Sequence, residues 1–239
     1  MRSRLLLTLL LICSGAIYIL STPVFKVRNI YVRGNAIVPS DKVIQLSGIK
    51  PGDNLLRLNT SKIDRRIKTN SYIGSATVKR NPVGDVYLVI SERSAAGISA
   101  YGKKYVTMDK KGAIIEIIDT KDGINLPLIT GLGIKNAVSG STVAIEDDRK
   151  LKSMEEIFNS VKTAGLSDII IEADLNDLQS IRIKTKYGIV LKIGNTDDID
   201  RKLEACKAIM DQDLIKKGLK GTIDVSYKGN PVFRPDNDK

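Results

Sequence analysis

Ser47 and Lys50 have the Ser-x-x-Lys spacing in which a lysine activates a serine nucleophile, as in penicillin-binding proteins. Those enzymes also carry an SDN and a KTG stretch, and this sequence holds neither. The chain has no histidine, which excludes Ser-His-Asp and Cys-His nucleophiles and most zinc sites. The pair lies where a short helix is expected to end, so we interpret it as part of a turn.

Two pairs of adjacent acidic residues could supply the carboxylates of a glycoside hydrolase. Such enzymes hold two carboxyl groups about 5 to 10 Å apart. Glu155-Glu156 and Asp197-Asp198 both lie on expected helices. We interpret the first pair as part of a solvated helix face. The second pair places negative charge at a helix N-terminus, where it is favourable.

The stretch VRGNAIV, residues 32–38, joins an expected strand to an expected helix, and such a junction can open a nucleotide-binding unit. A dinucleotide site needs a set of glycines that lets the backbone approach the pyrophosphate. This stretch has a single glycine, Gly34, and no repeated strand–helix crossover follows it. Gly34-Asn35 is therefore interpreted as a turn with unusual backbone angles. We expect no cofactor, no metal site and no catalytic residue in the chain.

The elements around these residues predict a small α+β domain in the first half of the chain. Phe25 and Val27 are out of phase with Ile30 and Val32, which predicts a bulge or a late start of the first strand. The order β-α-α-β-β places two helices on one face of a three-stranded sheet. The expected elements are residues 24–33, 41–47, 61–68, 73–80 and 85–92.

Cap residues mark the ends of these two helices. Ser40 is expected to cap the first helix at its N-terminus, and Gly48 to end it. Asn59 or Thr60 is expected to cap the second helix.

The second half of the chain is expected to form a larger mixed α/β domain with an extended, antiparallel-rich sheet. Thr196 is expected to cap its last helix, and Cys206 lies on the apolar stripe of that helix, so we expect a buried, unreactive thiol. The expected strands are residues 104–109, 113–118, 168–173, 178–185, 188–194, 221–227 and 230–234, and the expected helices are residues 147–163 and 197–215.

The N-terminus has the composition of a membrane segment. Arg2 and Arg4 precede an uncharged run that extends to Phe25, which meets the roughly 20 residues that a helix needs to cross a bilayer. The alternative is a cleaved signal peptide with a cut after Ala16. The apolar run continues through Leu20, which favours an uncleaved anchor. A short tail before a long domain favours the tail inside and the domain outside the cytoplasm.

The net charge of +11 raises the question of a nucleic-acid partner. The lysines are spread along the chain, and aromatic residues are few. A soluble domain close to anionic lipid headgroups or anionic wall polymers is the favoured interpretation, and we expect no nucleic acid.

Several stretches occur in the order that is typical of the bacterial cell-division proteins FtsQ and DivIB. They are VRNIYVRGN, IQLSGIKPGDNLLRLN, YIGSATVKRNPVGDVYLVISER and, near the C-terminus, GIVLKIGNTDDIDRKLEACKAI followed by GTIDVSYKGNPVFR. With the short tail and single apolar run before them, they make the sequence resemble that family from the anchor to the last strand. The resemblance implies that the β-α-α-β-β domain is a POTRA (polypeptide-transport-associated) domain.

The resemblance implies a division of the chain into five parts. These are a cytoplasmic tail (1–4), a transmembrane helix (5–23), the POTRA domain (24–93), a C-terminal β domain (94–233) and a disordered tail (234–239).

The resemblance further implies a non-enzymatic role. The family's proteins are single-pass, type II scaffolds of the division machinery at the septum of the cell membrane. Their partners are the single-span proteins FtsL and DivIC (FtsB in Gram-negative bacteria), and through them they influence septal peptidoglycan synthesis.

In the family, a partner peptide docks on the last strands of the β domain. The matching segment is TIDVSYKG, Thr222 to Gly229, where Tyr227 stands at the position of the family's tyrosine. The tryptophan that some members carry after it is absent, with Val232 and Phe233 as substitutes. Strand addition to an exposed edge is the expected mode. The implied contact residues are Ile223, Val225, Ser226, Tyr227, Val232 and Phe233.

Two other functional classes remain as alternatives. A membrane-anchored, wall-modifying enzyme would lose a turnover activity when Ser47 or a paired acid is substituted. A transport or assembly factor would carry POTRA domains in tandem, whereas one copy is expected here.

Overall fold

The computed structural model of the chain describes Leu10, residues 25–215 and residues 217–236, without the side chains of residues 212 and 213. The chain divides into two compact units, residues 1–93 and 94–239. The expected tail (1–4) and transmembrane helix (5–23) lie outside the described residues, with the exception of Leu10. In the part that is described, no helix combines the length and the hydropathy needed to cross a membrane.

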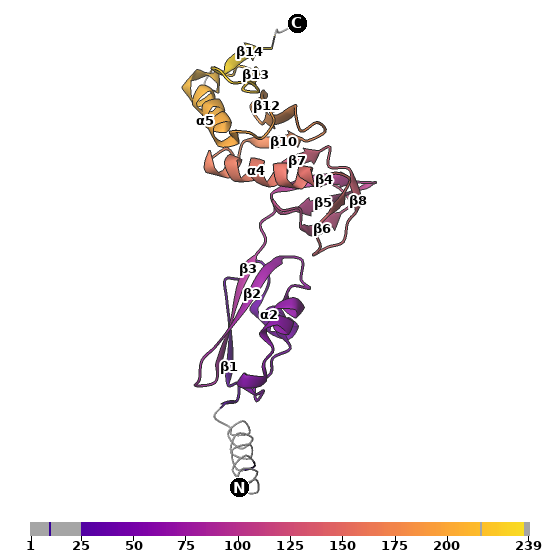
Figure 1. Ribbon diagram of the computed structural model, residues 1–239, viewed down its shortest axis with the longest axis vertical. Coiled ribbons are helices and arrows are strands. Elements are labelled where there is room, and N and C mark those ends of the chain that lie inside the picture. The colour runs from indigo at the N-terminus through magenta and orange to yellow at the C-terminus, as the bar shows by residue number, and fades with distance from the viewer. Residues whose placement is uncertain (1–9, 11–24, 216, 237–239) are drawn as a thin grey trace, which may run out of the picture. The chain divides into compact units, whose positions relative to one another are not determined.

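The first unit is a three-stranded sheet with its helices on one face (Figure 1). The central strand β3 pairs in parallel with β1 and antiparallel with β2, in the order β1-β3-β2. The predicted β-α-α-β-β order is present, with a short 3-10 helix η2 between the two helices. The bounds are β1 Asn29–Arg33, α2 Ser40–Ser47, η2 Leu55–Arg57, α3 Thr60–Ile67, β2 Ile73–Arg80 and β3 Asp85–Glu92.

Local chemistry sets the ends of these elements. The late start of β1 is confirmed, because Lys26 makes only an isolated bridge to Asn54 before the strand begins. Asn59 caps α3 as predicted by accepting a hydrogen bond from the Lys62 amide at 2.9 Å. The predicted cap Ser40 is wrong. Pro39 occupies that position, and the Ser40 hydroxyl instead accepts from the Asn35 side chain.

The core of the first unit lies between the sheet and the helices. Alternate residues of β3 are fully or nearly fully buried, as a strand with one covered face requires. They meet buried aliphatic residues of both helices and of β2. The buried set is Val27, Val38, Val43, Ile49, Leu55, Ile63, Ile67, Ile73, Ala76, Val86, Leu88 and Ile90.

The second unit contains a nine-stranded mixed sheet in the order β14-β13-β12-β11-β10-β7-β4-β5-β6. Five of the eight strand pairs in this described sheet are antiparallel. The bounds are β4 Gly97–Tyr101, β5 Lys104–Met108, β6 Ile114–Ile118, β7 Leu128–Thr130, β10 Ile170–Asp174, β11 Ile181–Thr185, β12 Ile189–Gly194, β13 Gly221–Asp224 and β14 Val232–Pro235. A separate two-stranded sheet joins β8 Ile134–Asn136 to β9 Ala144–Ile145.

Helices α4 (Arg149–Thr163) and α5 (Ile199–Ile209) pack against each other and share one hydrophobic core with the sheet (Figure 1). A π-helical turn, η3 (Met210–Leu214), continues α5. Cys206 is fully buried, as predicted. The predicted cap Thr196 is wrong: Asp198 holds that position in the left-handed conformation, and its side chain makes no capping hydrogen bond.

The C-terminal strands differ from their predicted bounds. Strand β13 ends at Asp224 instead of continuing to Tyr227. Strand β14 includes Arg234, the last residue of the expected strand 230–234, and Pro235, which we expected in the disordered tail, and the Asp236 amide donates a hydrogen bond to the Lys220 carbonyl. These two residues stay in the sheet because the backbone pairing with β13 extends to Pro235.

Candidate partner-binding site

Strand β14 forms one edge of the nine-stranded sheet, and β13 lies inside it (Figure 1). Strand β13 pairs in parallel with β12 on one side and antiparallel with β14 on the other. Strand β13, at the start of the expected segment Thr222–Gly229, is therefore not itself a free edge, because Val232–Pro235 pairs with it. The edge that could accept another strand belongs to β14.

The direction of the backbone N–H and C=O groups of β14 determines which hydrogen-bond donors and acceptors the free edge presents. The Asp236 amide points toward β13 and bonds to Lys220 O at 3.1 Å. Because successive peptide groups alternate across a strand, Arg234 and Val232 share that direction. Phe233 and Pro235 then turn their backbone groups outward, and proline has no N–H. Phe233 thus supplies the one outward amide donor of β14, flanked by outward carbonyl groups.

Three of the six expected contact residues contribute to the core. Ile223 is fully buried and Val225 is 5% exposed, and both belong to the main hydrophobic cluster. Phe233 lies opposite Ile223 in the β13–β14 register and is half-buried against the same cluster. These side chains hold the two strands in place, and only the backbone of Phe233 reaches the free edge.

Ser226 has a positioning role in the turn after β13. Its hydroxyl donates to Asp224 Oδ1 at 2.6 Å and its amide donates to the same oxygen at 3.0 Å. Asp224 Oδ2 accepts from Lys192 Nζ on β12 at 3.0 Å. Burial opposes ionisation of this carboxyl, but the hydrogen bonds from Ser226 and Lys192 outweigh burial and lower the pKa of Asp224.

Tyr227 and Val232 are the two expected contact residues with exposed side chains, at 45% and 39%. The Tyr227 hydroxyl donates to the Asn230 carbonyl at 3.3 Å, so the ring folds back over the loop that joins β13 to β14. The ring packs against Gly229, where an added Cβ would lie 3.2 Å from Tyr227 Cε2. This end of the sheet therefore presents an aromatic ring, an aliphatic side chain and a strand edge together.

Sequence reasoning missed two residues that shape this site, Arg234 and Lys192. Arg234 is exposed on β14 and pairs with Thr222 across the strands. Arg234 lies in the expected strand 230–234, but nothing in the sequence identified it as a residue of the site. Lys192 could not be assigned to the site, because nothing in a sequence specifies that β12 and β13 pair in parallel.

The residues first considered for catalysis lie apart from this site. Ser47 is fully buried at the end of α2; its hydroxyl donates to Ile44 O at 2.6 Å and accepts from the Ile49 amide. This agrees with the interpretation of the stretch as part of a turn, and the hydroxyl has no open path to a substrate. Glu155 and Glu156 lie on α4 near Lys111 (3.8 Å) and Lys152 (3.7 Å).

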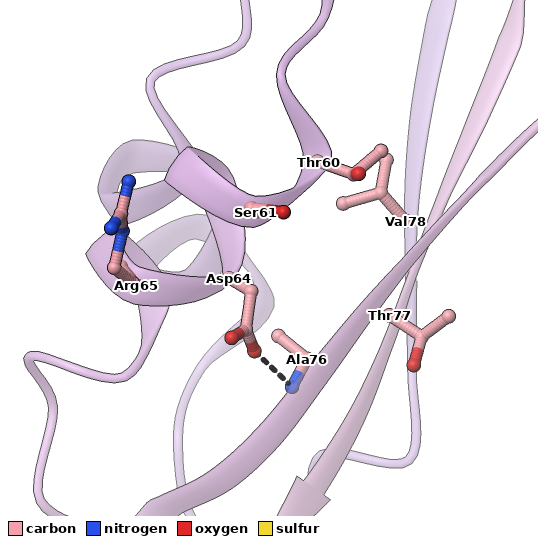
Figure 2. A pocket seen from close by; sticks show the side chains of 7 residues that line it. All are labelled: Thr60, Ser61, Asp64, Arg65, Ala76, Thr77 and Val78. Atoms are coloured by element: carbon pink, nitrogen blue, oxygen red, sulfur yellow. Dashed lines mark hydrogen bonds between the residues drawn. The ribbon is translucent and has the colours of Figure 1, made fainter.

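Each unit has a surface pocket. The first, of about 370 Å³, lies between α3 and the edge of β2 (Figure 2). Asp64 accepts a hydrogen bond from the Ala76 amide at 3.1 Å there and pairs with Lys68 at 2.9 Å. Thr60 and Ser61 also line this pocket. Its acid is already engaged, and the chain has no histidine to serve as a base.

The second pocket, of about 780 Å³, lies beside the first turn of α4 and is lined mainly by polar and charged side chains. Asp147 and Arg149 pair within it at 2.7 Å, and this hydrogen bond lowers the pKa of Asp147 to about 2. No group of three or more histidine, cysteine, aspartate or glutamate side chains in the described residues is arranged to hold a metal ion.

Comparisons with known proteins assign both units. Residues 25–93 match the family model of the FtsQ-type POTRA domain, and residues 98–226 match that of the C-terminal domain of cell division protein FtsQ/DivIB. The sequence is 34% identical to cell division protein DivIB of Clostridium acetobutylicum, over 93% of this chain and 88% of the relative.

More distant relatives match over similar lengths. Cell division protein DivIB of Clostridium botulinum strain Loch Maree is 29% identical over 90% of this chain and 83% of the relative. Cell division protein FtsQ of Syntrophotalea carbinolica is 24% identical over 94% of this chain and 79% of the relative.

Proposed function

The chain belongs to the FtsQ/DivIB family of cell-division proteins, and on that premise we propose that it is a membrane-anchored scaffold of the bacterial division machinery. Its extracytoplasmic units bind FtsL- and DivIC-type single-span proteins at the septum. Through these partners it supports septal peptidoglycan synthesis. The role is binding, with no catalytic step of its own.

The binding mode we propose is strand addition at β14. A partner strand donates hydrogen bonds to the outward carbonyls of Phe233 and Pro235 and accepts one from the Phe233 amide. Main-chain bonds of this kind fix orientation, and side chains beside the edge supply specificity. Tyr227 and Val232 provide that apolar contact. Tyrosine is favoured in such positions because its large ring is ordered at low entropic cost.

The observation that carries this proposal is the combination of a free edge and two exposed apolar side chains at one end of the sheet. Exposed edges promote pairing with another chain, and proteins usually protect them. The prolines 231 and 235 limit unspecific pairing here, because neither offers an amide donor. An edge with a single donor accepts a partner whose pattern of donors complements it.

The test uses the full chain in lipid nanodiscs and the outer domains of an FtsL–DivIC pair from the same organism. The site variant is Tyr227→Ala with Val232→Lys. The matched control is Tyr187→Ala with Ile171→Lys, because Tyr187, in the turn between β11 and β12, is 38% exposed and Ile171, on β10, is 50% exposed. Surface substitutions are preferable to truncation before β13, which would remove Ile223 from the core.

We expect the site variant to weaken binding about tenfold or more, since interface anchors typically contribute over ~1 kcal/mol. The control variant should bind as the natural chain does. Circular dichroism and thermal melts establish that both remain folded. Equal affinity of the two folded variants contradicts the proposed site. Absence of binding by the natural chain contradicts the proposed partner pair.

A further inference from the structure

The positive charge of the chain is concentrated in the first unit. Residues 25–93 hold 13 lysines and arginines against five acidic residues, whereas residues 94–239 hold 23 against 22. The lysines are spread along the whole sequence, but in residues 94–239 acidic residues nearly balance the basic ones. The excess charge therefore calls for an explanation within the first unit.

Three segments meet at the end of this unit where β1 begins. Lys26 makes a backbone bridge to Asn54, just before η2. The Arg28 amide donates to Gly84 O in the β2–β3 turn at 2.7 Å. Arg80, at the end of β2, donates from its guanidinium to Leu55 O at 2.8 Å. We call the surface formed here the basal surface.

The basal surface carries a cluster of exposed cations. Two acidic residues lie close to it: Asp53 accepts from the Lys50 amide at 2.8 Å, and Asp85 accepts from the Asn29 side chain at 2.9 Å. The exposed basic residues of this surface are Lys26, Arg28, Lys50, Arg57 and Arg80. Within the described part of the chain, none of these five side chains forms an ion pair with an acid.

Two aliphatic side chains project from the same surface. Leu56 in η2 is 50% exposed, and Val83 in the β2–β3 turn is 63% exposed. Both belong to short connecting segments, where a polar residue would satisfy the backbone equally well. Exposed apolar side chains ringed by lysine and arginine are typical of surfaces that lie on a membrane, where the apolar groups enter the headgroup region.

The path of the chain indicates which binding partner the basal surface faces. The uncharged run that ends at Phe25 leads directly into the basal surface, four residues before β1 begins. A backbone of four residues spans at most about 15 Å. If that run is embedded in the bilayer, as the proposed function has it, the basal surface lies within reach of the headgroups.

We propose that the basal surface docks on anionic lipid headgroups, with Leu56 and Val83 in the interfacial region. The inference rests on the membrane anchor of the proposed function. Lysine and arginine near an anionic surface each contribute attraction, and several together give a defined orientation. Docking fixes the orientation of the first unit against the membrane.

The test places a fluorophore at Val83 in the full chain, in nanodiscs that carry a headgroup-level quencher. The labelled variant is Val83→Cys with Cys13→Ala, since the buried Cys206 has a pKa raised to about 12 and resists labelling. The matched control is Ile37→Cys, which is 60% exposed. Its amide bonds to Glu92 at the far end of β3, about 24 Å along the strand from Asp85.

We expect strong quenching at position 83 in nanodiscs with anionic lipid, weaker quenching in neutral nanodiscs and little at position 37 in either. Equal quenching at 83 and 37, or none at 83 while the chain is inserted, overturns the proposal. A chain that does not incorporate into nanodiscs overturns the anchor itself, and the docking proposal with it. Co-purification of the chain with the nanodiscs therefore distinguishes failure of the membrane anchor from failure of the docking proposal.

Charge variants test whether the basal surface or the overall charge is responsible. The basal variant is Lys26→Gln with Arg28→Gln and Arg57→Gln. The control, Lys42→Gln with Lys62→Gln and Arg65→Gln, removes the same charge from exposed positions of α2 and α3. We expect the difference between anionic and neutral nanodiscs to disappear in the basal variant alone. Equal effects of both variants would mean diffuse attraction and contradict a defined surface.

Discussion

Asp224 on β13 and Lys192 on β12 lie opposite each other in the parallel register, with Oδ2 and Nζ 3.0 Å apart. Asp224 is 5% exposed, and Ser226 donates twice to its other oxygen. A buried carboxylate with this set of donors joins the last internal strand to the sheet. It also anchors the turn that leads to Tyr227, so the core and the candidate site share one hydrogen-bond network.

Asp224→Asn should destabilise the second unit at neutral pH by roughly 1.5 to 3 kcal/mol, the range for hydrogen bonds to charged groups. The folded-state pKa of Asp224 is lowered, so its stabilising contribution is complete above the unfolded pKa of about 3.9. That contribution is lost as the pH falls below this value. Denaturant unfolding of the 25–239 fragment at pH 7 and pH 3 measures the difference.

The natural fragment and Asp224→Asn should differ less at pH 3 than at pH 7. Asp122→Asn, in an exposed loop after β6, provides the control and should leave the unfolding free energy unchanged. A gap between natural and variant fragments that is constant with pH would mean that the charge of Asp224 does not stabilise the fold.

Gly34 and Gly52 allow the strain of a left-handed backbone to be separated from a steric clash. Both have positive φ, +83° and +94°. A Cβ at Gly34 would lie 2.3 Å from Ile90 O, whereas one at Gly52 meets nothing within 4 Å. Gly52→Ala should therefore cost only the backbone penalty of about 1 to 2 kcal/mol. Gly34→Ala should cost distinctly more, because the β1–α2 turn must move away from β3.

Thermal or denaturant unfolding of the first unit compares the two alanine variants. Equal destabilisation would show that the turn relaxes freely. The close contact between Gly34 and Ile90, near the end of β3, would then not be a determinant of the fold.

Many of the helices and strands could be predicted, because their signals are local. Strands β2 and β3 match the predicted residues 73–80 and 85–92. Gly48 ends α2 in the left-handed conformation, as a C-terminal glycine should. Cys206 lies on an apolar stripe of period 3.6 and is buried accordingly.

The remaining features depend on tertiary contacts that sequence patterns do not contain. Ser40 could have capped α2, but the Asn35 side chain engages its hydroxyl. Strand β4, with the sequence GISAY, was missed because it begins with Gly97; the close approach of the Ile129 side chain, 2.4 Å from an added Cβ, explains why that position holds glycine. The expected contact residues came from both β13 and β14, but no sequence pattern indicates that the short segment Val232–Pro235 pairs with β13 and forms the edge of the sheet.

Cys206 should resist thiol reagents until the second unit unfolds. Burial raises the pKa of its thiol to about 12, so the reactive thiolate is scarce at pH 8. In a Cys13→Ala background, labelling with a chromogenic disulfide should be negligible in buffer and complete in denaturant. Ile37→Cys in the same background controls for reagent activity. Rapid labelling of Cys206 in the folded chain would contradict its burial.

Pro235→Val tests whether proline limits pairing at the β14 edge. Pro235 turns its backbone outward beside Phe233, so valine there adds a second outward amide two residues from the first. Arg234→Val is the matched control, because it introduces the same side chain at a residue whose amide faces β13. The 25–239 fragment suits the measurement, since it retains both hydrophobic cores.

We expect sedimentation velocity to show increased self-association of the Pro235→Val fragment and none for Arg234→Val, since two adjacent donors make the edge a better template for a second strand. The partner domains should compete with this association if they bind the same edge. Self-association that persists at saturating partner would place the partner elsewhere, and association of Arg234→Val alone would assign the effect to side-chain hydrophobicity. Either result would remove the backbone of β14 from the proposed binding mode.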